Sequence, residues 1–162
     1  MARSPARLVL DDFLPYRLSV ASNLVSDGIA RTYESLFGLT IPEWRLIAVI
    51  AESEGVTQHA IGQRTRMDKV TVSRAAIALV DRGLLTRAAN PDDRRSHLLR
   101  LSGAGAELYA AVAPKALDLE AQLSAHFDPA EIAQFMAMLR RIEALALDAA
   151  GPSAAPGDEK RR

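Results

Sequence analysis

Apolar positions recur at intervals of three and four residues in several separate segments of the chain. Over residues 11–36 this spacing predicts a long amphipathic helix, with Pro15 tolerable only near its start and Gly38 ending it. The final predicted helix, which starts at Asp128, shows the same spacing and indicates a seam for a partner helix. The seam positions are Ile132, Phe135, Leu139, Ile142 and Ala146.

Start signals place two short helices in the middle of the chain, after a helix that begins at Thr40. That earlier helix has Pro42 in its first turn and Glu43 three residues after Thr40, as a capping box requires. Thr57 is a suitable N-cap for the first short helix, and the second covers residues 69–82. A tight link and a shared apolar cluster predict a helix-turn-helix. The cluster consists of Ile61, Val72, Ala76 and Leu79.

Two short apolar segments, residues 84–88 and 97–101, predict a β-hairpin whose loop carries two aspartates and two arginines. A helix-turn-helix followed by such a hairpin is the order of a winged helix-turn-helix. The fold class is therefore mainly α with a small β-hairpin wing. Beyond the wing, Ser102 can cap a helix over about residues 104–126, with Pro114 as an expected point of disturbance.

These elements predict one folded domain over residues 11–148, between a flexible arm (1–10) and a disordered tail (149–162). The chain of 162 residues has no net charge, but its charge is unevenly distributed. Residues 57–100 hold nine basic and four acidic side chains, a net charge of +5, and the remainder carries −5. Such a basic region is either a footprint for phosphate or a fluctuation of composition.

Cysteine is absent, which excludes disulfides, thiolate metal sites and thiol redox sensing, and fits a reducing compartment. The N-terminal apolar stretch is too short for a signal peptide, and the longest apolar run, residues 46–51, is too short to span a bilayer. We expect a cytoplasmic protein with no membrane partner.

Four segments of the chain resemble the MarR (multiple antibiotic resistance regulator) family of winged-helix transcription factors. They are TVSR (71–74), DRGLLTR (81–87), PDDRRSHLLRLS (91–102) and GAGAELY (103–109). The resemblance implies a homodimer whose terminal helices, about residues 11–36 and 104–148, form the dimerisation region around a DNA-binding lobe at about 40–101. It also implies repression of nearby genes and release of DNA when a small ligand binds. Oxidant sensing through a first-helix cysteine, found in some members, is excluded here.

The recognition helix and the wing supply the expected DNA contacts. The N-terminal part of a recognition helix enters the major groove, where Arg74 can contact guanine, and Thr71 and Ser73 can contact phosphate or base edges. By the resemblance, Arg95 enters the minor groove, Asp93 orients it and Arg94 contacts phosphate. The alternative for the wing is a solvated turn with weak surface ion pairs. The expected DNA-binding residues are Lys69, Thr71, Ser73, Arg74, Asp93, Arg94 and Arg95.

The resemblance also implies an effector site in a crevice between the dimerisation helices and the winged lobe. An arginine beside aromatic rings suits an anionic aromatic compound. For Trp44 core packing is an alternative to ligand contact, and Arg17 could instead form a dimer ion pair. The candidate residues are Tyr16, Arg17, Ser19, Asn23, Trp44 and Arg45.

No catalytic or metal-binding motif is present. The chain lacks a phosphate-binding glycine loop and a nucleophile with a matching base, and its three histidines are far apart in sequence. We therefore expect no enzyme activity and no cofactor apart from the effector. The expected function is a ligand-responsive, sequence-specific DNA-binding repressor that acts as a homodimer on a pseudo-palindromic operator. The alternative is an adaptor whose basic winged lobe binds an acidic protein.

Overall fold

The computed structural model describes residues 7–150, which divide into two units at Ala116 and Leu117. Of the expected flexible arm and tail, residues 1–6 and 151–162 lie outside the described residues. The first unit contains a short 3-10 helix, Leu10–Asp12, followed by α1 (Leu14–Phe37) and the winged lobe. The second contains α6 (Pro129–Ala150), which extends two residues beyond the expected end of the folded chain. Helix α5 (Gly103–Ser124) begins in the first unit.

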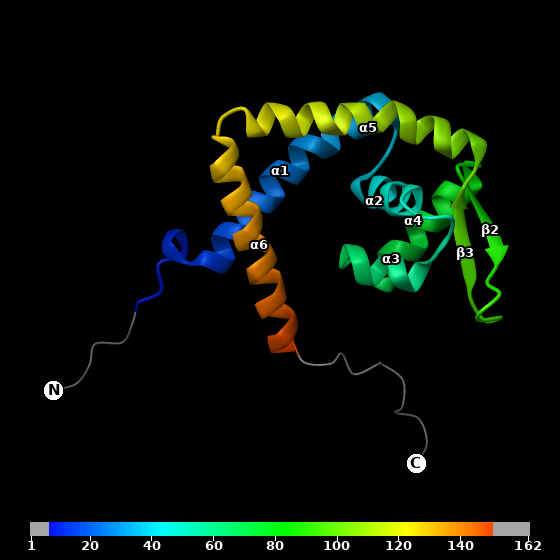
Figure 1. Ribbon diagram of the computed structural model, residues 1–162, viewed down its shortest axis with the longest axis horizontal. Coiled ribbons are helices and arrows are strands. Elements are labelled where there is room, and N and C mark those ends of the chain that lie inside the picture. Colours follow the sequence, from blue (N-terminus) through cyan, green and yellow to red (C-terminus); the bar gives the residue numbers. More distant parts are fainter. Residues whose placement is uncertain (1–6, 151–162) are drawn as a thin grey trace, which may run out of the picture. The chain divides into compact units, whose positions relative to one another are not determined.

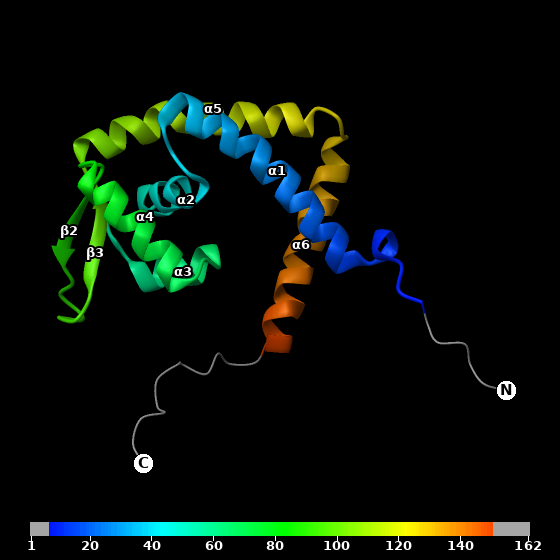
Figure 2. The ribbon, with the colours of Figure 1, turned by 180° about the vertical axis from the view of Figure 1, so that it is seen from behind.

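The winged lobe consists of three helices and a small sheet. Helices α2 (Ile41–Ala51), α3 (Gln58–Thr65) and α4 (Lys69–Asp81) are followed by strands β2 (Leu85–Ala89) and β3 (His97–Leu101). Figures 1 and 2 show, from opposite sides, this hairpin beside α3 and α4. The predicted helix-turn-helix and wing are both confirmed, with the first strand starting one residue later than expected.

The sheet has a third strand that the sequence did not predict. Strand β1 (Val56–Thr57) pairs antiparallel with β3, so the order is β1-β3-β2. Leu99, in the middle of β3, lies opposite both Val56 and Arg87. Two residues are too short for any period-two pattern, so only the tertiary fold shows this strand. It fixes the start of α3 against the base of the wing.

The helix starts follow the predicted capping signals. The Glu43 carboxylate accepts from the Thr40 backbone N–H at 2.7 Å and from its hydroxyl at 2.9 Å. The Glu43 N–H donates to Thr40 Oγ1 at 3.4 Å, which completes the capping box. Thr57 Oγ1 caps α3 by accepting from Ala60 N–H at 3.2 Å. These caps satisfy backbone donors that a helix start leaves without intrahelical partners.

The core of the lobe lies between the helices and the inner face of the sheet. The predicted cluster is buried, since Ile61, Val72, Ala76 and Leu79 have 1% or less of their surface exposed. Burial of a valine, leucine or isoleucine side chain stabilises the fold by about 1.5–3 kcal/mol. The core therefore fixes the angle between α3 and α4. Other completely or almost completely buried side chains are Leu39, Leu46, Ile47, Ile50, Leu99 and Val112.

Helix α5 begins at a tight joint with the hairpin. Ser102 caps it as predicted, because its hydroxyl accepts from Gly105 N–H at 3.0 Å. The Ser102 N–H donates to the Leu84 carbonyl at 3.1 Å, just before the first residue pair of the hairpin. The helix continues through Pro114, so the expected disturbance does not end it.

Candidate nucleic-acid interface

The start of α4 is fixed by the carboxylate of Asp68. Its Oδ1 accepts from the backbone N–H groups of Val70 and Thr71, both at 2.9 Å, and its Oδ2 accepts from the Thr71 hydroxyl at 2.6 Å. These bonds, the one from the Thr71 hydroxyl first, hold the pKa of the Asp68 carboxyl below its usual range. The first turn of α4 is thus ordered before any partner binds.

The outward face of α4 differs from the expected one. Lys69 and Arg74 are exposed as predicted, but Thr71 and Ser73 are half-buried. Thr71 also donates its hydroxyl hydrogen to Asp68, which leaves only its oxygen lone pairs for another partner. The exposed side chains of this helix instead include Val70 and Ile77, which lie four before and three after Arg74. The prediction from the sequence placed only polar residues on the outward face of this helix and therefore missed Val70 and Ile77.

The wing loop is closed by its own side chains. Asn90 Nδ2 donates to Ser96 Oγ at 2.8 Å across the mouth of the loop, and Asp92 N–H donates to Asn90 Oδ1 at 3.1 Å. Ser96 in turn donates through N–H and hydroxyl to the Asp93 carbonyl, at 3.0 and 3.1 Å. These bonds close the turn without a contribution from the guanidinium of Arg94 or Arg95.

Asp93 and Arg95, the pair that the resemblance singled out at the wing tip, are linked by a hydrogen bond. Asp93 Oδ1 accepts from the Arg95 backbone N–H at 3.0 Å and lies 3.5 Å from its Nε. The backbone bond from Arg95 is the main reason that the pKa of Asp93 is lowered. The Arg95 side chain is nevertheless 94% exposed, and Arg94 is exposed beside it. Asp93 therefore fixes the main chain at Arg95 and lies near one nitrogen of a guanidinium that is otherwise exposed to solvent.

A hollow of about 510 Å³ lies between the wing and the starts of α3 and α4. Lys69 and Arg95, two expected DNA contacts from different elements, both line it, and Arg87 adds a third cation from β2. Sequence reasoning gave no role to the two histidines in its lining, since they are distant in sequence. The ionisable lining residues are His59, Lys69, Arg87, Asp93, Arg95 and His97.

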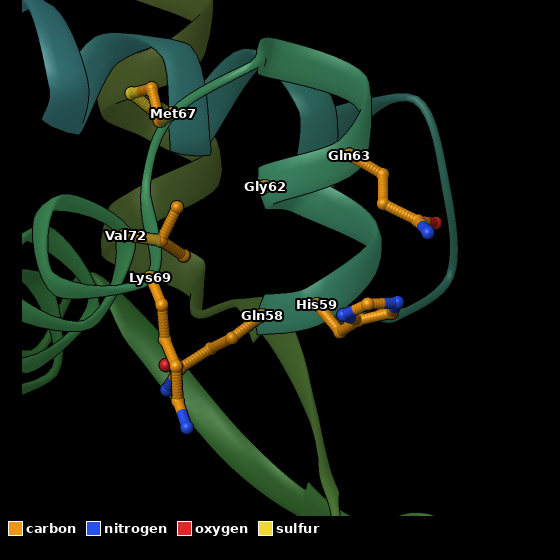
Figure 3. Close-up of a pocket in the computed structure, with 7 residues that line it drawn as sticks. All are labelled: Gln58, His59, Gly62, Gln63, Met67, Lys69 and Val72. Atoms are coloured by element: carbon orange, nitrogen blue, oxygen red, sulfur yellow. The ribbon is translucent and has the colours of Figure 1, made fainter. Parts of the chain in front are cut away.

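A second hollow, of about 450 Å³, lies between α3 and the start of α4 (Figure 3). Gln58 and Lys69 line it at the two helix starts, and Met67 and Val72 add apolar side chains to the lining. It shares Gln58, His59 and Lys69 with the hollow beside the wing. The two hollows thus form one grooved surface along the helix-turn-helix, and its cations, Lys69, Arg87 and Arg95, lie on the side of the wing.

The six effector candidates are not brought together in either hollow. Tyr16, Arg17, Ser19 and Asn23 are exposed on the first half of α1, and Arg45 is exposed on α2. Trp44 is half-buried between two aromatic rings, edge-to-face with Tyr33 at 5.5 Å and stacked on Tyr109 at 5.9 Å. This packing of α1, α2 and α5 accounts for Trp44 without a ligand.

Residues 7–150 contain no cluster of metal-binding side chains and no membrane-spanning helix. Within that range no three histidine, cysteine, aspartate or glutamate side chains are placed to hold one ion. No helix there is both long and apolar enough to cross a bilayer.

The helix-turn-helix, the arginine-tipped wing and the basic surface between them define a winged-helix DNA-binding protein. Residues 37–96 match the sequence model described as MarR family. The chain belongs to the MarR family and is a DNA-binding transcriptional regulator rather than an enzyme. The adaptor alternative is not favoured.

One curated relative agrees with this assignment, and two solved structures share the fold. A putative transcriptional regulatory protein for the hcr operon of Thauera aromatica is 26% identical over 113 residues, 70% of this chain and 68% of the relative. A MarR/EmrR family regulator from Acinetobacter sp. ADP1 superposes with a TM-score of 0.81 at 23% identity, over 87% of this chain and 99% of the other. Sco3205 of Streptomyces coelicolor, solved in complex with DNA, gives 0.76 at 21% identity over 96% and 97%.

Proposed function

We propose that this regulator is a homodimeric, ligand-responsive repressor that binds a pseudo-palindromic operator. One observation carries the DNA-binding part: Lys69 at the start of α4 and Arg95 at the wing tip line the same basic hollow. A recognition helix and a wing so placed can engage one stretch of duplex together. In a dimer, two recognition helices would lie about 34–36 Å apart, one turn of DNA.

The roles of the individual side chains follow from their chemistry. Arg74 is exposed on α4 and long enough for two hydrogen bonds to guanine in the major groove. Lys69, Thr71 and Ser73 supply contacts to phosphate or base edges around it. Arg95 suits the narrow minor groove, where negative potential is concentrated, and Arg94 suits a phosphate. Asp93 holds Arg95 in position for insertion.

The homodimer is supported by apolar side chains that the single chain leaves exposed at both ends. On α1 and the segment before it they include Phe13, Leu14, Leu24 and Val25. On α6 they include Phe135, Met136, Met138, Leu145 and Leu147. Clusters of this kind on terminal helices favour burial against a second copy. The seam predicted on α6 includes Phe135, which is half exposed.

Effector response is supported by the exposed polar and charged groups of α1 and α2. Arg17 and Arg45, with Tyr16, Ser19 and Asn23, offer cations, a ring and hydrogen-bond donors to an anionic aromatic compound. Trp44 packs on Tyr33, ten residues and about 15 Å along α1 from Asn23, so Trp44 and Arg45 would face the α1 groups only across a dimer. Moving most of the protein from a DNA-bound to a released form requires about 5.5 kcal/mol of differential affinity.

The test is selection of bound duplexes from random DNA at about 150 mM salt, where non-specific phosphate binding is weakened. We expect an inverted repeat with half-sites about 10 base pairs apart. Arg95→Ala should then weaken operator binding at least about tenfold, or about 1.4 kcal/mol, which lies within the about 1–3 kcal/mol that one good base contact contributes. Sedimentation should show that the dimer is intact.

Arg94→Ala is the matched control, since it removes the same charge from the adjacent position. A phosphate contact should cost less and reduce the salt dependence by about one counterion. Equal effects of the two variants would contradict groove insertion by Arg95. A monomer in sedimentation, or the absence of any motif, would contradict the dimeric repressor.

A further inference from the structure

The recognition helix exposes an apolar side chain in its first turn. Val70, the second residue of α4, is 57% exposed, although the inner face of the same helix buries Val72, Ala75 and Ala76. Exposing Val70 contributes nothing to the core. A β-branched residue on a helix surface also lowers helix propensity slightly compared with alanine. The fold gives no reason for valine at this position.

The position of Val70 is fixed relative to the groove-facing cation. Its backbone N–H donates to Asp68 at 2.9 Å, so the N-cap holds the residue in the first turn. Arg74 follows four residues later and therefore lies on the same face of the helix. Lys69, immediately before Val70, lines the basic hollow beside the wing. Val70 thus lies beside two exposed cations of its own helix, Lys69 and Arg74.

The major groove offers one apolar group to such a side chain. Among the four bases only thymine presents a methyl group there, and apolar side chains recognise it by contact. Residues near the start of a recognition helix are the ones that reach base edges. We propose that Val70 contacts the C5 methyl of a thymine beside the base bound by Arg74. This inference rests on the proposed function and names one base that the operator must contain.

The experiment replaces single thymines of the selected operator by deoxyuridine, which removes only the methyl group. At one position in each half-site we expect about a fourfold loss of affinity, the value of one methylene-sized group leaving an apolar contact. In Val70→Ala the wild-type operator should bind correspondingly more weakly, and deoxyuridine at that position should have no further effect. Because Val70 is exposed, Val70→Ala should fold normally. Circular dichroism and the melting temperature of the variant check this.

Ile77→Ala is the matched control. Ile77 is 47% exposed on the same face but lies about 10 Å further along the helix from Val70, away from the end that enters the groove. This variant should keep the full sensitivity to deoxyuridine.

The outcomes distinguish failure of the Val70 contact from failure of the proposed function. If a motif is recovered but no thymine position shows the methyl effect, the Val70 contact is wrong and the dimeric repressor stands. The same holds if Val70→Ala keeps the methyl effect, because another residue then contacts the base. If no motif is recovered, the proposed function fails and this inference fails with it.

Discussion

Gly105 allows α5 to pack closely against the end of the wing, and its replacement by alanine should destabilise the fold. The residue is buried in the first turn of α5. A Cβ built there would overlap the Leu84 carbonyl oxygen and lie 3.4 Å from Leu101 Cδ2. Carbon and carbonyl oxygen ordinarily approach no closer than about 3.3 Å. Gly105→Ala therefore requires movement of the main chain rather than of a flexible side chain.

The magnitude follows from what must move. Overpacking of a rigid site costs about 1–3 kcal/mol, and a main-chain obstacle belongs at the upper end of that range. The Leu84 carbonyl also accepts from Ser102 N–H at 3.1 Å, so its displacement weakens a hydrogen bond of about 1 kcal/mol. We expect Gly105→Ala to lower the free energy of unfolding by about 3–4 kcal/mol. With a urea slope of about 2 kcal/mol per M, the midpoint should fall by about 1.5–2 M.

Gly103→Ala provides the matched control two residues earlier in the same helix. Nothing lies within 4 Å of a Cβ at that position. Alanine has fewer conformations than glycine in the unfolded chain. Gly103→Ala should therefore be slightly more stable than the wild-type protein, by up to about 0.5 kcal/mol. Both variants are measured by urea unfolding at one protein concentration, because the stability of an oligomer depends on concentration. Equal midpoints for Gly103→Ala and Gly105→Ala would refute the close approach of α5 to Leu84.

Two further predictions concern the caps of α4 and α2. Asp68→Asn should lower the free energy of unfolding at neutral pH. The pKa of Asp68 in the folded protein lies below its ordinary 3.8. The stability that the carboxylate contributes is therefore complete above pH 3.8 and is lost as the pH falls through the folded-state pKa. Urea unfolding from pH 7 to 3 checks this, and a wild-type–variant difference that disappears above pH 5 would contradict it. Glu43→Ala should lower the free energy of unfolding by about 2 kcal/mol, because the buried carboxylate completes the capping box and lies 3.5 Å from Arg82 Nη1. Thr40→Ala, which removes only the cap, should lower it by about 1 kcal/mol. Thermal unfolding of the two variants measures the difference. If Glu43→Ala loses no more stability than Thr40→Ala, the carboxylate contributes nothing beyond the cap.

Local signals in the sequence determined most of the lobe. Thr40 with Glu43, Thr57 and Ser102 each carry the side chain that a helix start requires, and each caps the helix predicted for it. The cluster of Ile61, Val72, Ala76 and Leu79 is buried as its spacing predicted. These features depend on near neighbours in the chain, so they can be inferred without tertiary information.

The wing tip was predictable for a related reason. Asp93 and Arg95 are two residues apart, and the bond between them is formed within the turn itself. The resemblance to the MarR family supplied the role of that pair, which the spacing alone left open between groove insertion and a solvated turn. The family assignment is confirmed, while the groove contact stays a prediction.

Only the tertiary structure decided which side chains share a surface. Strand β1, with two residues, has no pattern of its own and exists because β3 offers it a partner. The orientation of α4 depends on which face the core buries, and this leaves Val70 exposed while Thr71 and Ser73 are half-buried. Likewise His59 and His97 line one hollow because β1, α3 and the wing meet there. Contacts between residues distant in the chain depend on packing geometry, which a periodic pattern does not contain.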